Sequence, residues 1–208
     1  MSADDQLYPI CDMFASLQGE ATWSGRPMLF IRAWGCPLAC AWCDEPLHRD
    51  PKARQLLSRH AIRTALQHLA PELRAVVLTG GEPLALPDLS GLVADLHHHG
   101  YWVAMESSGV GGTLPDPPVD WLTLSPKTPL PDTLYHAANE IKWVLGAEGG
   151  STEFILALAN RHPNVWVQPR AHGNTPDPAA LARCLQLTMQ ANGRLRLSVQ
   201  MHKYIGIR

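Results

Sequence analysis

Apolar residues gather in short runs that alternate along the chain with longer segments of helical periodicity. Strands buried on both faces are short and nearly continuously apolar. Runs of this kind are Met28–Ala33, Ala75–Leu78, Trp102–Met105, Trp121–Leu124, Ile141–Leu145, Val165–Gln168 and Leu195–Val199. Helical candidates lie between them, around residues 53–69, 88–99, 131–138, 151–161 and 177–192. This alternation predicts parallel strands joined by right-handed crossovers.

The length of the chain limits the architecture that these elements can form. About six strand–helix units fit into 208 residues, whereas a closed eightfold barrel typically takes about 250 residues. We therefore expect an α/β fold, an open and partial barrel with reduced helical cover, built as a single domain over residues 1–208. Hydrophobic residues make up 46% and charged residues 17%, a balance that is typical of globular rather than disordered chains.

Net charge and cysteine content narrow the class of protein. A formal net charge of −2 gives no electrostatic signature of a nucleic-acid or membrane-surface partner. Since no apolar run reaches the roughly 18–20 residues that a membrane span needs, we expect no membrane partner and a cytoplasmic location. The five cysteines are an odd number, and three lie within eight residues. They favour reduced thiols over a disulfide framework.

Polar and glycine-rich segments follow five of the predicted strands. In barrel-like sheets the carboxyl ends of parallel strands share one edge, and ligands bind there. We therefore expect these segments to form one site. They are the cysteine loop at 34–50, residues 79–83 (Thr-Gly-Gly-Glu-Pro), 106–109 (Glu-Ser-Ser-Gly), 125–127 (Ser-Pro-Lys) and 168–169 (Gln-Pro).

The most informative motif is Cys36, Cys40 and Cys43, spaced C-x3-C-x2-C. A cubane iron–sulfur cluster takes one thiolate on each iron, so three cysteines leave one iron open to a small molecule. The alternative is a structural zinc loop in which His48 is the fourth ligand. Zinc would explain neither the Gly80-Gly81-Glu82 segment nor the other polar segments at the strand ends.

The cysteine spacing resembles that of the radical S-adenosylmethionine (SAM) enzymes. The Gly-Gly-Glu-Pro of residues 80–83 resembles the segment that binds the methionine amino group of SAM in that superfamily, and Trp42 matches the aromatic position against the adenine. More narrowly, the chain is similar to the 7-carboxy-7-deazaguanine synthase family. The segments that carry this second resemblance are residues 16–20 (Ser-Leu-Gln-Gly-Glu), 32–36 (Arg-Ala-Trp-Gly-Cys), 125–127, 140–142 (Glu-Ile-Lys) and 200–208.

The resemblance implies a specific reaction. A [4Fe-4S] cluster on the three cysteines would bind SAM, and its reduction would generate a 5′-deoxyadenosyl radical. The radical would initiate conversion of 6-carboxy-5,6,7,8-tetrahydropterin to 7-carboxy-7-deazaguanine with loss of ammonia, in queuosine biosynthesis. It further implies a flavodoxin or ferredoxin as reductant and a homodimeric assembly. The rival within the superfamily is an enzyme that activates a glycyl-radical enzyme. The rival of another class is a zinc-stabilised interaction module without catalysis.

The resemblance also assigns residues. SAM would be bound by Trp42, Cys43, Asp44, Gly80, Gly81, Glu82, Glu106, Ser108, Ser125, Pro126, Lys127 and Gln168. The pterin would be bound by Leu17, Gln18, Gly19, Glu20, Arg32, Thr79, Gln200, His202 and Arg208, with residues 194–208 closing over it. In the family that the chain resembles, Thr or Ser usually stands at the position of Glu45, and its hydroxyl binds magnesium. Glu45 is a candidate Mg²⁺ ligand that would bring a full negative charge towards an anionic substrate.

Several of these residues have a plainer interpretation. Arg32 on an apolar strand needs an anion, which is either the substrate or a neighbouring carboxylate. Glu82 could brace its loop while the backbone binds the ligand, and Lys142 could lie on the surface. Cys11 and Cys184 lie among hydrophobic residues and predict core positions. The three consecutive histidines at 97–99 predict a solvated helix end, because consecutive helical residues point in different directions.

Overall fold

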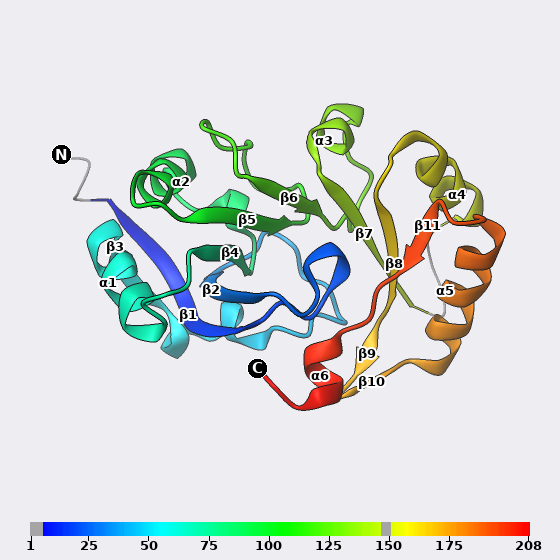
Figure 1. Cartoon of the computed structure of the whole chain (residues 1–208), viewed down its shortest axis with the longest axis horizontal. Helices are drawn as coiled ribbons and strands as arrows, with labels where there is room; N and C mark the ends of the chain where they lie inside the picture. The colour runs from blue at the N-terminus through cyan, green and yellow to red at the C-terminus, as the bar shows by residue number, and fades with distance from the viewer. Residues whose placement is uncertain (1–5, 147–150) are drawn as a thin grey trace. The chain divides into compact units, whose positions relative to one another are not determined.

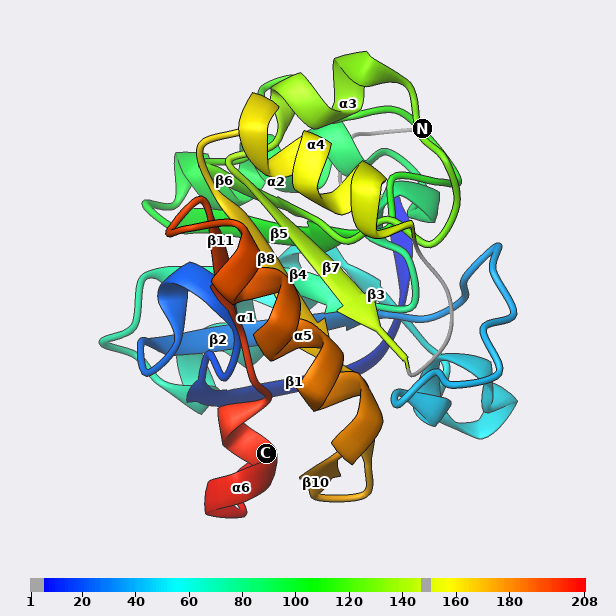
Figure 2. The ribbon, with the colours of Figure 1, turned by 90° about the vertical axis from the view of Figure 1, so that its right-hand side faces the viewer.

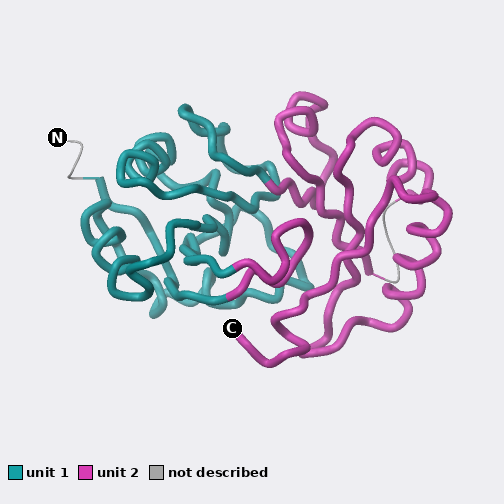
Figure 3. Tube along the Cα trace, viewed as in Figure 1, with its two compact units in different colours: residues 1–16, 27–122 teal, residues 17–26, 123–208 magenta. Residues whose placement is uncertain are grey.

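The computed structural model describes residues 6–146 and 151–208, and Figure 1 shows the course of the chain. Its contacts divide the chain into two compact units, coloured in Figure 3. Unit 1 comprises residues 1–16 and 27–122, and unit 2 comprises residues 17–26 and 123–208. No helix in the described ranges is long and apolar enough to cross a membrane. The single domain expected over residues 1–208 stays a prediction.

The strands of unit 1 lie in the order β5-β4-β2-β1-β3. The strands β1 and β3 pair with each other in antiparallel orientation. The strands β2, β4 and β5 run parallel, with Leu29 opposite Val76 and Val76 opposite Val103. These central residues are fully buried, which explains why the strands are apolar throughout. The bounds are β1 Leu7–Leu17, β2 Pro27–Ala33, β3 Gln55–Ser58, β4 Ala75–Gly80 and β5 Trp102–Ser107.

Two helices, α1 (Arg59–Leu69) and α2 (Leu89–His98), pack on unit 1 and on each other. Each begins at a side-chain cap: Ser58 Oγ accepts from Ala61 N at 3.2 Å, and Asp88 Oδ1 accepts from Gly91 N at 3.1 Å. Such caps satisfy amide groups that lack a partner in the first turn. The short 3-10 helices of unit 1 are η3 (Pro46–Arg49), η4 (Pro51–Ala53) and η5 (Pro83–Ala85).

Four strands of unit 2 lie in the order β11-β8-β7-β6 and run parallel, whereas β9 and β10 form a separate antiparallel pair. Figure 2 shows α5 in front of the parallel strands of this unit, where it contacts β8 and β11. The bounds are η2 Ala21–Trp23, β6 Trp121–Leu124, α3 Asp132–Ala137, β7 Glu140–Leu145, α4 Thr152–Arg161, β8 Val165–Pro169, β9 Ala171–His172, β10 Thr175–Pro176, α5 Pro178–Gln190, β11 Leu195–Leu197 and α6 Met201–Ile205.

The seven predicted strands are all present, each within two residues of its predicted ends. The helix expected over 53–69 was wrong at its start, because residues 55–58 form β3 and pair with β1. The long strand β1 was not predicted, and Pro9 in its interior explains why, since proline is unusual inside strands. The helix α6 was not predicted either.

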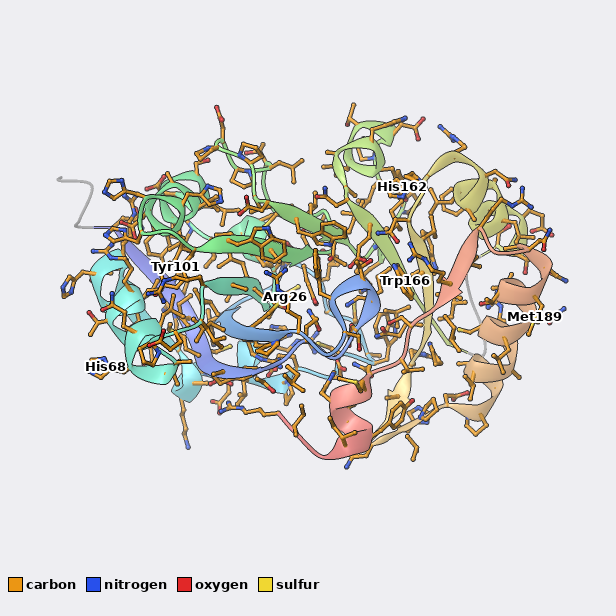
Figure 4. All side chains as sticks on the ribbon, in the orientation of Figure 1. Arg26, His68, Tyr101, His162, Trp166 and Met189 are labelled. Carbon is orange, nitrogen blue, oxygen red and sulfur yellow. The ribbon has the colours of Figure 1, made fainter. Side chains whose placement is uncertain are left out.

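Several plain interpretations of single residues are confirmed. Cys11 and Cys184 are buried among apolar residues, and His98 and His99 are exposed at the end of α2. Trp166, labelled in Figure 4, donates from Nε1 to Asn164 Oδ1 at 2.9 Å and stacks under the Arg196 guanidinium. These contacts give the tryptophan a packing role within unit 2.

Candidate active site

The three cysteines lie on the loop that follows β2, and all three are half-buried thiols outside any disulfide. Burial raises the pKa of the Cys36 thiol; the Leu38 amide, which donates to its sulfur at 3.4 Å, acts in the opposite direction, and the Glu82 charge raises the pKa further. In the described ranges, no group of three or more His, Cys, Asp or Glu side chains is arranged around one metal position. A cluster does not need such convergence, because each thiolate binds a different iron.

His48 follows the cysteines and is almost completely buried, at 2% exposure. Its Nε2 lies 3.4 Å from Cys43 Sγ. Burial lowers the pKa of His48, and the neighbouring Arg49 charge adds to the effect. His48 therefore touches one of the cysteine sulfurs, as the zinc interpretation required, but without the convergent set of ligands that a zinc ion needs.

The Gly-Gly-Glu-Pro turn at the end of β4 lies directly against the start of the cysteine loop. Gly81 N donates to Ala33 O, and Glu82 N donates to Gly35 O, each at 2.9 Å. A Cβ atom on Gly81 would stand 1.9 Å from Gly35 O. Only glycine permits this approach, so the two motifs that the sequence placed one strand apart are joined by their backbones.

The Glu82 side chain, 1% exposed, is surrounded by donors of its own unit. It accepts from Leu84 N at 3.1 Å, Ser107 Oγ at 2.6 Å and Ser108 N at 2.8 Å, and also from Ser108 Oγ. This many donors hold the carboxylate in one orientation. Glu82 thereby ties the turn after β4 to the end of β5, which supports the bracing role considered from the sequence.

Arg32, on β2, forms an ion pair with Glu45 of the cysteine loop. The other Glu45 oxygen, Oε1, accepts from Leu47 N at 3.1 Å and caps η3. Arg32 Nε is buried without a hydrogen-bond partner within the described structure. Thr79 is opposite Arg32 in the β2–β4 register, so two predicted substrate residues are neighbours in unit 1.

Unit 2 contains a second network, built around Glu20. Glu20 forms an ion pair with Lys142 and accepts from Gln200 Nε2 at 2.8 Å. Lys203 Nζ in turn donates to Gln200 Oε1 at 2.9 Å. Lys142 is almost fully buried, so the surface position considered for it was wrong. The structure thus joins the predicted substrate residues Glu20 and Gln200, which are far apart in the sequence.

The segment before Glu20 packs against the carboxyl-terminal residues. Gln18 Oε1 accepts from the amides of Gly19 and Glu20 at 2.7 and 3.1 Å. Met201 N donates to Gly19 O at 2.9 Å, and a Cβ on Gly19 would meet His202 Nδ1 at 2.0 Å. Gly19 is therefore needed for the close approach of His202, within the segment that was predicted to close over the substrate.

The predicted SAM residues of unit 2 have partners in the same unit. Lys127 Nζ donates to Ser125 Oγ at 2.6 Å and to its carbonyl at 3.0 Å. The buried Gln168 accepts from Ser198 Oγ at 2.7 Å, and Ser198 itself accepts from Ala21 N at 2.9 Å. Ser198 was missed from the sequence, where a single serine after an apolar run gives no distinctive signal.

For the remaining predicted site residues the structure gives the degree of burial. Trp42 is 38% exposed beside the third cysteine. Asp44 and Arg208 are also exposed, whereas Leu17, Thr79 and Glu106 are half-buried and Pro126 is buried. The contacts described above do not show whether these side chains bind SAM or the substrate. Their assignment stays a prediction.

Comparison with known proteins places these motifs in a known context. The family model "Radical SAM superfamily" matches residues 32–161, which include the cysteine loop and the glycine turn. A 7-carboxy-7-deazaguanine synthase from Synechocystis is 32% identical, over 97% of this chain and 94% of its own. One from Escherichia coli K12 is also 32% identical, over 96% and 99%.

A solved structure shows the same fold. The crystal structure titled as QueE from Escherichia coli superposes with a TM-score of 0.75 at 29% identity, covering 95% of this chain and 96% of that chain. With the superfamily match, it confirms the predicted fold class, an open α/β barrel of the radical SAM type.

Proposed function

The chain belongs to the 7-carboxy-7-deazaguanine synthase family of the radical SAM superfamily, and from this we propose how its residues divide the work. The chain is a radical SAM carbon–nitrogen lyase that converts 6-carboxy-5,6,7,8-tetrahydropterin to 7-carboxy-7-deazaguanine. Its family implies a [4Fe-4S] cluster and SAM. When bound, these cofactors supply the adenosyl radical, and the protein binds, orients and shields the reactants.

The thiolates of Cys36, Cys40 and Cys43 would hold three irons of the cluster. The donor chemistry fits, because the three thiols lie on one loop, are partly accessible and form no disulfide. The two amide hydrogen bonds from Gly81 and Glu82 fix the glycine turn against this loop. We assign the backbone of Gly80 and Gly81 to the amino group of SAM, which needs acceptors, and a bracing role to Glu82.

The other SAM contacts are carried over from the resemblance. In unit 1 they are Trp42, Asp44, Glu106 and Ser108, and in unit 2 they are Ser125, Pro126, Lys127 and Gln168. The hydrogen bonds of Lys127 to Ser125 and of Ser198 to Gln168 would orient the unit 2 side chains before SAM binds.

Arg32 is the proposed contact for the substrate carboxylate. A guanidinium has five N–H donors, and in this chain Glu45 takes one at Nη1 while Nε lies buried without a partner. Glu45 would therefore hold Arg32 in place and leave its other edge for the substrate. Arg32 would thus bind two carboxylates, that of Glu45 on one edge of the guanidinium and that of the substrate on the other.

Magnesium fits these contacts poorly. Both oxygens of Glu45 already accept from N–H groups, one of them on the cationic Arg32. Mg²⁺ requires nearly ideal octahedral oxygen geometry, and a neighbouring guanidinium repels it. We assign no step to magnesium and propose that Glu45 acts through Arg32.

In unit 2 the Glu20 network is the proposed contact for the polar edge of the pterin. Pterins carry ring N–H groups, for which a fixed carboxylate is a suitable acceptor. Lys142 and Gln200 hold Glu20, and Gln18 braces the amides beside it. Leu17, Gly19, Thr79, His202 and Arg208 are the further proposed substrate contacts.

The proposal rests on the backbone hydrogen bonds that join the glycine turn to the cysteine loop. They occur in a chain that aligns with these synthases over almost its full length. The test supplies anaerobically reconstituted, reduced protein with SAM and 6-carboxy-5,6,7,8-tetrahydropterin. We expect 7-carboxy-7-deazaguanine by mass spectrometry from the native chain and from Cys184→Ala, which removes a core thiol, and none from Cys40→Ala.

Other outcomes would point to the rival functions. SAM cleavage without the deazaguanine would contradict the assigned reaction and favour the activating-enzyme alternative. Bound zinc without sulfide would contradict both and favour the non-catalytic module. A flavodoxin or ferredoxin reductant, a homodimer and a cytoplasmic location remain proposals from the family resemblance and from the thiol content.

A further inference from the structure

His48 stands out among the buried polar groups of unit 1, because neither the reaction nor the family motifs assign it a role. The 3-10 helix η3 fixes the His48 backbone: Glu45 caps that helix at Leu47 N, and the His48 carbonyl accepts from Gly35 N at 3.0 Å. The ring is 2% exposed and presents Nε2 to Cys43 Sγ at 3.4 Å. A proposed cluster ligand therefore has an imidazole directly beside its sulfur.

The surroundings of the ring decide which nitrogen carries the proton. Nδ1 is buried and has no partner in the described residues. A proton on Nδ1 would leave a buried N–H donor without an acceptor, which is unfavourable, and would turn the Nε2 lone pair towards sulfur. A proton on Nε2 makes a hydrogen bond to sulfur and leaves only an unpaired acceptor. The Nε2–H form is therefore favoured.

Loss of the Cys43 thiol proton would strengthen the hydrogen bond from His48 Nε2–H to the sulfur. As a thiol, Cys43 lies 3.7 Å from the Glu45 carbonyl, to which its S–H donates. As a thiolate on iron it has no proton to donate and becomes a charged acceptor. Hydrogen bonds to charged acceptors are about twice as strong as neutral ones.

We infer that His48 donates Nε2–H to the Cys43 thiolate and raises the reduction potential of the cluster. Hydrogen bonds to the sulfurs are among the factors that set the potential of an iron–sulfur cluster. Reduction adds one electron, from the flavodoxin or ferredoxin class of donor, and no proton moves. The added negative charge is stabilised by the N–H dipole at Cys43. His48 is thus a positioning residue that acts through a ligand.

The inference rests on the proposed cluster but not on the identity of the substrate. Its test is the midpoint potential of the reconstituted full-length chain without SAM, followed by electron paramagnetic resonance (EPR) during redox titration. His48→Leu removes the donor, and His48→Gln keeps an N–H near the Nε2 position. Iron and sulfide contents are measured for each variant, so that loss of cluster is not mistaken for a shift in potential.

We expect His48→Leu to lower the equilibrium constant for one-electron reduction about tenfold, which corresponds to about 59 mV, and His48→Gln to stay within about twofold of the native chain. An unchanged potential in His48→Leu with an intact cluster would overturn the inference. A shift in His48→Gln as large as that in His48→Leu would also overturn it, because the hydrogen bond would then not be the cause.

A second measurement uses the native chain and does not depend on either variant assembling a cluster. In the reduced protein with ¹⁵N-labelled histidine, pulsed EPR should detect a weak nitrogen coupling and an exchangeable proton that is lost in D₂O. No histidine coupling, or the strong coupling of a nitrogen bound to iron, would contradict the hydrogen bond. Failure to form the deazaguanine would remove the proposed reaction but would leave both of these measurements interpretable.

Discussion

The cysteine loop of unit 1 and the Glu20 network of unit 2 hold their functional residues by different kinds of contact. In unit 1 the contact is between main chains: Gly81 and Glu82 donate to the carbonyls of the β2 end and the cysteine loop. In unit 2 it is between buried charged and polar side chains, Glu20, Lys142 and Gln200. A main-chain contact depends on the space that glycine leaves, whereas a buried ion pair depends on both partners being present.

This difference predicts that a single methyl group added at Gly81, in unit 1, causes the largest loss of activity. In Gly81→Ala the new Cβ would meet the Gly35 carbonyl at 1.9 Å, and backbone atoms cannot rotate out of its way. The cysteine loop must then move, and a displacement of about 1 Å at a reaction site can cost about 100-fold in rate. We expect product formation to fall by at least this factor, measured by mass spectrometry.

The matched control is Gly173→Ala, at the β9–β10 hairpin of unit 2. This glycine has φ +59°, but nothing lies within 4 Å of its Cβ position. The left-handed conformation alone costs a non-glycine residue about 1–2 kcal/mol, so its activity should remain near that of the native chain. Equal losses in the two variants would show that the clash between the Gly81→Ala methyl group and the cysteine loop is not the cause.

The second effect concerns the ion pair of unit 2. Lys142→Met would leave the Glu20 carboxylate buried without its cation, and breaking a buried pair in this way costs about 3–5 kcal/mol. We expect a loss of this size in the free energy of unfolding, measured by urea denaturation. The double variant Lys142→Met with Glu20→Gln should recover part of it. A single variant as stable as the native chain would contradict the role of the pair.

The third effect concerns magnesium. Since Glu45 is occupied by Arg32 and Leu47, adding Mg²⁺ to EDTA-treated native enzyme should change the rate by less than about twofold, and calorimetry should detect no Mg²⁺ binding at the site. Glu45→Thr, which supplies the hydroxyl that the resemblance describes, should become Mg²⁺-dependent by about tenfold. Glu45→Gln, which lacks the hydroxyl, should remain unresponsive. Strong Mg²⁺ activation of the native chain would contradict this account of Glu45.

The smallest expected effect is a difference in alkylation between the loop cysteines and the core cysteines. Burial raises the pKa of Cys184 to about 12 and that of Cys11 to about 11. Both thiols therefore stay protonated between pH 7 and pH 9, and only the thiolate reacts with iodoacetamide. Peptide mass mapping of the cluster-free folded chain should find the loop cysteines alkylated and these two unmodified. Modification of Cys184 in the folded chain at pH 9 would show that it is not buried as described.

The sequence predicted the parallel strands and the motifs because both are local patterns. Each central strand is an unbroken apolar run, and the cysteine and glycine motifs have fixed spacings. The strand β1 was missed because Pro9 and scattered polar residues hide its pattern, and its position depends on pairing with β3. Likewise, nothing near Lys142 indicates that its partner is Glu20, 122 residues away. Long-range pairing of charges depends on the fold, so composition and spacing cannot reveal it.

The role of Glu45 shows the same limit within a single motif. Its position next to Cys43-Asp44 identified it as a departure from the family pattern, and Arg32 was known to need an anion. That these two residues satisfy each other became clear only from the structure, in which the cysteine loop returns to β2. The sequence therefore identified the unusual residue but not its partner.

We propose that three cysteine thiolates hold the cluster and leave one iron open to SAM. The most direct test compares the EPR spectrum of the reduced, reconstituted chain before and after addition of SAM labelled with ¹⁷O and ¹⁵N in its methionine carboxylate and amino groups. We expect a changed spectrum with magnetic coupling from both labels to the cluster. An unchanged spectrum from an intact cluster, with no coupling from either label, would contradict it.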